Sequence, residues 1–85
     1  MPWRVVLTPR AEREISALPP DVERRIVRRL RTFRVDPRPN GVLKLAGREG
    51  VYRIRVGDYR VLYRIEDAVL VVMVIHIGHR RDIYR

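Results

Sequence analysis

Hydrophobic residues recur with a helical period through the first half of the chain. Residues 3–7 form a short β-branched and aromatic run that predicts a strand, and Thr8 followed by Pro9 is typical of the start of a helix. A first helix is predicted over residues 9–18, and the break at residues 19–21 begins a second one. In the second helix the apolar residues stand three or four positions apart, as an amphipathic helix requires. They are Val22, Ile26, Leu30 and Phe33.

Beyond residue 41 the pattern changes to short apolar or alternating runs, which predict strands. The predicted strands are residues 42–45, 51–56, 59–65 and 69–77. Gly57 and Asp58 form one tight turn between them, and Glu66 and Asp67 form another. The element order is therefore β-α-α-β-β-β-β. We predict a single α+β domain over residues 1–85, with two N-terminal helices packed on one face of a largely antiparallel sheet.

The turn at Gly57 fixes the register of the central hairpin. Glycine comes first, as a type II′ turn requires, and this places Val56 opposite Tyr59 and Arg55 opposite Arg60. Because side chains alternate, one face is apolar and is predicted to pack beneath the helices. It carries Tyr52, Ile54, Val56, Tyr59, Val61 and Tyr63. The opposite face, which we call the arginine face, carries Arg53, Arg55, Arg60, Leu62 and Arg64.

Composition adds a strong positive charge to this picture. There are 19 Lys+Arg residues, of which only Lys44 is lysine, against 10 Asp+Glu, and the formal net charge is +9. A guanidinium fork matches phosphate oxygens, so this composition indicates a phosphate ligand. A GC-rich genome that encodes arginine in place of lysine, with a solvated surface, explains the composition equally well. It does not explain where the arginines stand.

Composition also excludes several classes of protein. With no cysteine and two histidines, neither a disulfide framework nor a structural zinc site is expected, and no cofactor is implied. The N-terminus lacks the apolar segment of a signal peptide, and the longest apolar run, residues 68–75, is too short to span a membrane. We therefore expect a soluble cytoplasmic protein without a membrane partner.

The opposed arginines favour a bound anion. Like charges directly opposite on a sheet destabilise it by about 0.2–1 kcal/mol per pair. Arg55 and Arg60 could simply splay into solvent, but four arginines on one face of two paired strands make a better phosphate cradle than a random surface. We favour the cradle. These residues alone distinguish neither RNA from DNA nor catalysis from binding.

The C-terminal residues add a second group of polar side chains. Histidine is the side chain suited to moving protons near neutral pH, so His79 could move a proton in phosphodiester cleavage. Tyr84, which follows Arg80 and Arg81, could stack on an unpaired base. A frayed polar terminus is the alternative explanation. His76, embedded among apolar residues, is expected to be a hydrogen-bonded sheet histidine instead of a catalyst.

Residues 43–85 resemble the RelE/ParE toxin superfamily, and within it the RelE branch. The resemblance rests on the motifs KL-x-G, YRIRVGDYRVLY and GHRRDIY, and the β-α-α start matches in layout. It implies an mRNA interferase, the toxin of a type II toxin–antitoxin pair. Such a toxin cuts mRNA in the ribosomal decoding site through metal-free attack by the ribose 2′-hydroxyl. The implied partners are a cognate antitoxin, the ribosome with its mRNA, and operator DNA bound by the toxin–antitoxin complex.

Carried over onto this chain, the resemblance also implies roles for individual residues. Arg60 matches the phosphate-holding arginine, Arg80 the tail arginine and Tyr84 the stacking tyrosine, while the strand cations are Lys44, Arg53 and Arg55. The predicted catalytic residues are Arg53, Arg55, Arg60, His79, Arg80 and Tyr84. The predicted substrate-binding residues are Lys44, Arg64 and Arg81.

The chain departs from some relatives at several of these positions. Arg53 and Arg55 replace lysines, and a guanidinium that stays protonated stabilises a phosphorane but is a poor general base. The remaining candidates for proton removal are His79, Tyr84, Lys44 or an element of the ribosome. Ala46 replaces a further arginine. Weak or no cutting of free RNA is therefore expected.

Two other functions remain open at this stage. A ParE-like toxin poisons DNA gyrase through the same fold without being an enzyme, and a basic nucleic-acid-binding module would have no activity. An acidic or amphipathic antitoxin segment is expected on the arginine face or on the outer face of the second helix. That outer face carries Arg24, Arg25, Arg28, Arg29 and Arg31.

Overall fold

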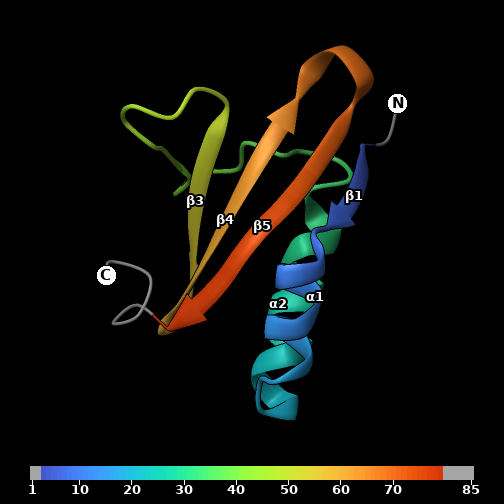
Figure 1. The fold of residues 1–85 in the computed structure, drawn as a ribbon, viewed down its shortest axis with the longest axis vertical. Helices are drawn as coiled ribbons and strands as arrows, with labels where there is room; N and C mark the ends of the chain where they lie inside the picture. Colours follow the sequence, from blue (N-terminus) through green and yellow to red (C-terminus); the bar gives the residue numbers. More distant parts are fainter. Residues whose placement is uncertain (1–2, 80–85) are drawn as a thin grey trace.

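The computed structural model describes residues 3–79, which form a five-stranded sheet with both helices on one side of it (Figure 1). In chain order the elements are β1 (Arg4–Leu7), α1 (Pro9–Ser16), α2 (Pro20–Thr32), β2 (Leu43–Lys44), β3 (Val51–Val56), β4 (Tyr59–Glu66), the 3-10 turn η1 (Asp67–Val69) and β5 (Val71–His79). The predicted α+β architecture and element order are confirmed. Neither helix in this part of the chain has the length and apolar character needed to cross a bilayer.

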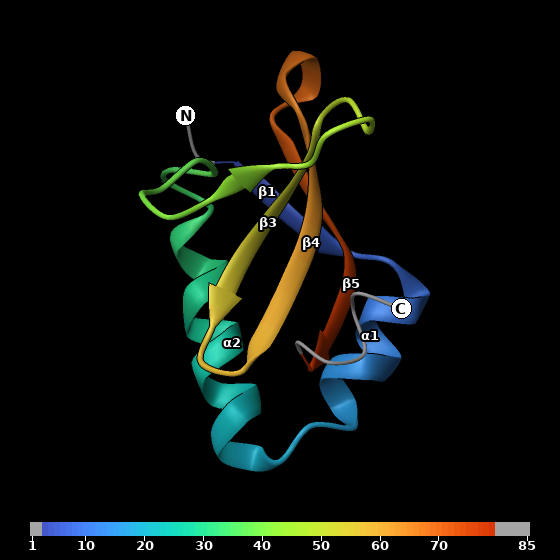
Figure 2. The ribbon, with the colours of Figure 1, turned by 90° about the vertical axis from the view of Figure 1, so that its left-hand side faces the viewer.

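The sheet brings the two ends of the described chain together. Its strand order is β1-β5-β4-β3-β2, so β5 lies inside the sheet between β1 and β4 (Figure 1). Figure 2 shows β3 and β4 side by side, joined by a turn that lies beside α2. Arg4 pairs with Val71 and Leu7 with Val74 in a parallel ladder, while the other three pairings are antiparallel. The prediction of a largely antiparallel sheet is therefore confirmed.

Local sequence explains where each helix begins. The Thr8 hydroxyl accepts a hydrogen bond from the Ala11 amide at 3.1 Å, and Pro9 occupies the first turn, where its missing N–H costs nothing. Pro20 starts α2 in the same way, with Asp21 in its first turn and arginines in its last turn. These charges complement the helix dipole. The first helix ends at Ser16, two residues before its predicted limit.

The core lies between the apolar faces of the helices and one face of the sheet. Its buried members are Ala11, Ile15, Ile26, Leu30, Phe33, Ile54, Val61, Tyr63, Ile65, Val72, Val74 and Ile77. The predicted apolar face of the hairpin supplies three of them, and Tyr52, Val56 and Tyr59 pack against the cluster at its margin. The arginine face therefore points away from the helices.

The predicted register of the hairpin is confirmed in full. Val56 faces Tyr59, and Arg55 faces Arg60. Gly57 has a φ of 61°, while Asp58 is not among the described non-glycine residues with positive φ. A positive φ at the first central residue alone is the signature of a type II′ turn.

The last strand differs from its prediction in position and in regularity. Residues 67–69 form a 3-10 turn and Leu70 adopts a left-handed conformation with a φ of 54°, so β5 starts at Val71 instead of residue 69. Within β5 the register shifts, because Leu62 faces His76 while Tyr63 faces Val74. The extra residue, Ile75, makes this a β-bulge.

Candidate active site

Three predicted catalytic arginines lie together on the arginine face. Arg55 and Arg60 are direct partners across β3 and β4, and Arg53 faces Leu62 in the next row. Rows on one face are about 7 Å apart along a strand, and neighbouring strands are about 4.8 Å apart. Arg55 is exposed and its Nε donates to the Gly57 carbonyl at 3.1 Å, while Arg53 and Arg60 are half-buried. Three cations therefore occupy a patch with the dimensions of one or two phosphates.

Arg64 lies on the same face but apart from this group. It follows Arg60 by four residues, which is about 13 Å along a strand. Its Nη1 donates to the Glu49 carbonyl at 3.3 Å, and its Nε lies 3.8 Å from Oε1 of Glu66. Arg64 is thus at the far end of the hairpin and partly neutralised.

The register does not group Lys44 with the arginine face. Lys44 pairs with Tyr52, and directly opposed residues of a ladder point to the same side of the sheet. Tyr52 belongs to the apolar face, whereas the neighbouring Leu43 is the residue that pairs with Arg53. The predicted role of Lys44 in binding substrate depends on access around the sheet edge.

His79 also lies with the apolar face. It pairs with Tyr59, and the two rings meet edge to face with centroids 5.4 Å apart. Gly78, which pairs with Arg60, occupies the corresponding position on the arginine face. The structure therefore does not place the His79 ring directly beside the arginine pair. Arg80, Arg81 and Tyr84 lie outside the described residues, and their predicted roles remain predictions.

His76 stands on the side of the sheet where the arginines are, because it pairs with Leu62. Its Nδ1 lies 2.7 Å from Oε2 of Glu14, and its Nε2 lies 3.5 Å from Nη2 of Arg10. The other oxygen of Glu14 accepts the Ile77 amide at 2.9 Å. His76 is therefore a sheet histidine in close contact with the side chains of Glu14 and Arg10 at the edge of the sheet. Its partner Glu14 was missed, because 63 residues separate Glu14 from Ile77 and no local motif links them.

The environment of Glu14 changes its acidity. Burial raises the pKa of the carboxyl, but the Ile77 amide, the His76 ring and the nearby Arg10 charge outweigh this and lower the pKa below its ordinary value of 4.5. The carboxylate form is therefore favoured in the fold. Among residues 3–79 no group of three or more His, Cys, Asp or Glu side chains could hold a metal ion.

A second cluster fixes the other end of the hairpin. The buried Tyr63 hydroxyl donates to the Pro37 carbonyl at 2.8 Å, and the Tyr63 ring lies 4.5 Å from that of Phe33. Arg38 binds Asp67 through two hydrogen bonds of 3.2 and 2.9 Å and lies over the Tyr52 ring. Burial raises the pKa of Tyr63, and the hydrogen bond from Arg38 lowers that of Asp67. These contacts hold the loop before β2 against the sheet.

Comparison with known proteins agrees with this architecture. The family described as "ParE toxin of type II toxin-antitoxin system, parDE" matches residues 5–84. Toxin RelG of Mycobacterium tuberculosis is 37% identical over 87 residues, covering 100% of this chain and 99% of that protein. Toxin RelE of the same organism is 34% identical, covering 99% of this chain and 88% of that protein.

A solved structure gives the same result. The archaeal RelE–RelB complex from Pyrococcus horikoshii contains a chain with a TM-score of 0.85 and 28% identity to this one, covering 96% of this chain and 99% of that chain. The family match spans nearly the whole sequence, and both curated relatives are named as Rel toxins. The chain therefore belongs to the RelE/ParE superfamily of type II toxin–antitoxin toxins, in its RelE branch.

Proposed function

We propose that this toxin is a ribosome-dependent endoribonuclease, an mRNA interferase that cuts mRNA in the decoding site. The observation that carries the proposal is the opposed pair Arg55 and Arg60, with Arg53 in the next row, on the side of the sheet away from the helices. A sheet that holds like charges directly opposite each other is stabilised when an anion binds between them. A phosphodiester supplies that anion.

The chemistry follows from what guanidinium groups can do. The ribose 2′-oxygen attacks the adjacent phosphorus, the bond from phosphorus to the 5′-oxygen breaks, and a 2′,3′-cyclic phosphate and a 5′-hydroxyl form. Arg53, Arg55 and Arg60 stabilise the negative charge of the phosphorane. One proton leaves the 2′-hydroxyl and another reaches the departing 5′-oxygen. Arginine is a poor base, so proton removal falls to His79, Tyr84, Lys44 or the ribosome.

In this proposal the ribosome does part of the positioning of the reacting groups. Holding the 2′-hydroxyl in line with the leaving oxygen supplies a large part of such an acceleration. The substrate is therefore mRNA on programmed ribosomes, and free RNA is cut weakly or not at all. Arg64, Arg81 and Lys44 serve as substrate-binding cations in this proposal, and Arg80 and Tyr84 complete the site.

The proposed partners follow from the relatives. The toxin of Pyrococcus horikoshii forms a complex with RelB, and we extend that kind of partner to this chain. An acidic or amphipathic antitoxin segment would cover the arginine face or the outer face of α2, and the complex would bind operator DNA. The site of action is the cytoplasm, where ribosomes and mRNA meet.

Primer extension on programmed ribosomes tests the proposal. The purified toxin should give cuts at the decoding site, and the variant Arg60→Ala/Arg80→Ala should give none. Arg4→Ala/Arg13→Ala removes the same charge from exposed positions on β1 and α1 and should cut like the wild type. No cuts by the wild type on ribosomes would overturn the proposal.

Gyrase poisoning is the second candidate, because the family description names ParE. A supercoiling assay with purified gyrase and the same variants separates the two functions. Inhibition of supercoiling without mRNA cuts would establish gyrase as the target. If the protein neither cuts mRNA nor inhibits supercoiling, the remaining candidate is a nucleic-acid-binding protein without activity.

A further inference from the structure

A row of side chains beside the opposed arginines is partly apolar. The register runs from Leu43 on β2 to Arg53 on β3 and on to Leu62 on β4. Directly opposed residues of a sheet point to the same side. Since Arg53 belongs to the arginine face, Leu43 and Leu62 lie on that face as well, one on each side of it. We call these three residues the leucine row.

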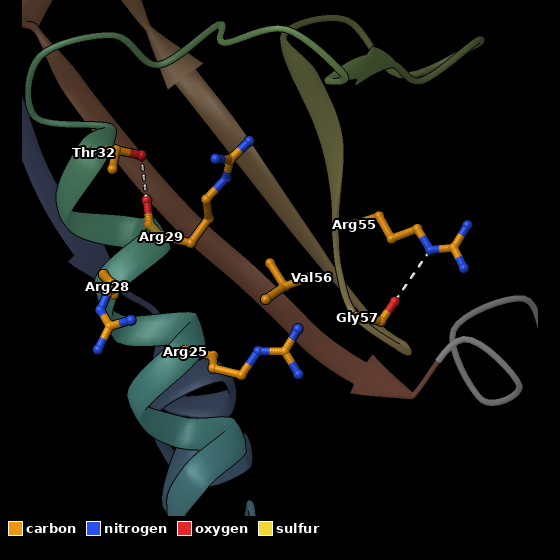
Figure 3. A pocket seen from close by; sticks show the side chains of 7 residues that line it. All are labelled: Arg25, Arg28, Arg29, Thr32, Arg55, Val56 and Gly57. Atoms are coloured by element: carbon orange, nitrogen blue, oxygen red, sulfur yellow. Dashed lines mark hydrogen bonds between the residues drawn. The ribbon is translucent and has the colours of Figure 1, made fainter.

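The next row on this face holds the opposed arginines, Arg55 and Arg60. Figure 3 shows how side chains alternate at this level of β3: Val56 points towards α2, whereas Arg55 points to the other side and donates from its Nε to the Gly57 carbonyl. Successive rows on one face are about 7 Å apart. The leucine row therefore lies directly beside the site that we assign to a phosphate.

Leu43 presents apolar surface to solvent where another cation would serve an anion better. Its relative exposure is 54%, and Leu62 is half-buried. Within residues 3–79 the other exposed large apolar side chains are those of Val35 and Val69, which lie outside the strands. Covering an apolar side chain is favourable only if the covering group is itself apolar. A ligand that fits both rows therefore carries an apolar part beside its charged part.

An unpaired nucleotide combines these two parts. A ribose separates its phosphate from its base, so two rows about 7 Å apart can hold the two ends of one nucleotide. The flat face of a base packs on apolar side chains and stacks on guanidinium planes, as in much single-stranded RNA recognition. In a double helix the neighbouring bases cover those faces. The leucine row thus favours an unpaired strand over a duplex and over a simple anion.

A protein segment fits the leucine row less well. Protein partners are anchored by large side chains that enter desolvated pockets, whereas Leu43 and Leu62 stand in one row of a sheet surface. The row spans two strand spacings, which is about 10 Å. A flat ring system covers such a strip more fully than a single branched side chain does.

We propose that the leucine row is a nucleobase subsite, which holds the unpaired base of a nucleotide whose phosphate lies between Arg55 and Arg60. The base covers Leu43 and Leu62 and stacks on Arg53 between them. A purine, with two fused rings, covers more of the strip than a pyrimidine and binds more tightly. The identification of the ligand as RNA rests on the proposed function.

Competition binding with uncleavable oligonucleotides tests the subsite without ribosomes. The probes are deoxy tetranucleotides, which lack the attacking 2′-hydroxyl and carry adenine, thymine or no base at all four positions. The wild type should bind the adenine form at least about fivefold more tightly than the abasic form, as expected for one stacked base. Leu43→Ser should remove most of this advantage and leave the affinity for the abasic form unchanged. Arg55→Gln should weaken the binding of all three forms.

The matched control is Val69→Ser, which removes another exposed apolar side chain, in η1, and should keep the full advantage of the adenine form. Equal binding of the adenine and abasic forms by the wild type would overturn the proposal. So would an advantage that survives Leu43→Ser but is lost in Tyr84→Ala, because the base would then be held elsewhere. Equal affinities for adenine and thymine would refute the purine preference.

A leucine-containing polyglutamate peptide is the second probe. If Leu43→Ser weakens binding of the peptide but leaves the advantage of the adenine form intact, the leucine row docks protein and the proposal is wrong. Because no ribosome is present and no probe can be cut, a failure of mRNA cleavage would bear on the proposed function and leave the base-binding result unaffected.

Discussion

The Nδ1 of His76 lies 2.7 Å from Oε2 of Glu14, and this contact joins β5 to α1 across the edge of the sheet. The ladder of β1 and β5 ends at Leu7 and Val74, so beyond Val74 the edge of β5 that faces away from β4 has no strand beside it. Oε1 of Glu14 accepts the Ile77 amide there. One carboxylate thus replaces a strand at an otherwise open edge.

Glu14→Gln should make the free energy of unfolding less dependent on pH in the acidic range. The pKa of Glu14 is lowered in the fold, so its carboxylate stabilises the native state above the unfolded value of 4.5. That contribution is lost as pH falls through the lowered folded pKa. Urea unfolding should show the variant about 1–2 kcal/mol less stable at neutral pH, with the gap closing in acid. Glu12→Gln, on the exposed side of α1, is the control, and a gap independent of pH would contradict the assignment.

Tyr63→Phe should lower the free energy of unfolding by about 1–3 kcal/mol, because the Pro37 carbonyl loses its donor in a buried place. Tyr59→Phe removes a hydroxyl that makes no hydrogen bond within residues 3–79 and should cost less than about 0.5 kcal/mol. Chemical denaturation of both variants measures the difference. Equal losses would show that the Pro37 bond contributes little.

Gly57→Ala should be destabilising for two separable reasons. A left-handed φ costs an L-residue about 1–2 kcal/mol, and the new Cβ would also meet the guanidinium of Arg25. Gly47→Ala has a similar positive φ of 77° with nothing within 4 Å, so it should show only the first effect. Arg25→Ala combined with Gly57→Ala should recover the second effect. Identical losses for Gly57→Ala and Gly47→Ala would exclude the contact.

Phosphate should stabilise the arginine face specifically. At roughly five times its Kd, a bound anion adds about 1 kcal/mol to the stability of the folded state. In the background Arg25→Gln/Arg28→Gln, sodium phosphate should raise the melting temperature above that in NaCl of equal ionic strength. Adding Arg55→Gln should abolish this rise while changing stability in NaCl by less than about 0.5 kcal/mol. A rise that survives Arg55→Gln would argue against an anion between Arg55 and Arg60.

The hairpin could be predicted from sequence because its determinants are local. A two-residue turn and strict alternation fix which residues face each other, and the placement of Arg53, Arg55 and Arg60 follows. The faces of the two histidines could not be predicted. They depend on the length of the connection at residues 67–70 and on the one extra residue that the bulge inserts into β5.

The remaining differences arise from contacts distant in sequence. β2 has only two residues, and its pairing turns Lys44 towards the side of Tyr52, which the apolar pattern of a short edge segment does not reveal. The link from Tyr63 to Pro37 spans 26 residues, and that from His76 to Glu14 joins a strand to a helix. Side-chain contacts of this kind depend on the assembled fold and leave no periodic signal.

The interior position of β5 makes the whole sheet depend on the last strand of the described chain. β5 is the last strand of the described chain, yet β1 has no other neighbour in the sheet, and Val72, Val74 and Ile77 complete the core. A nascent chain that ends before β5 retains a lone hairpin and a short edge strand, and a two-stranded hairpin is at best marginally stable in water. We therefore expect a chain that lacks β5 to lose the fold on which the arrangement of the arginine face depends.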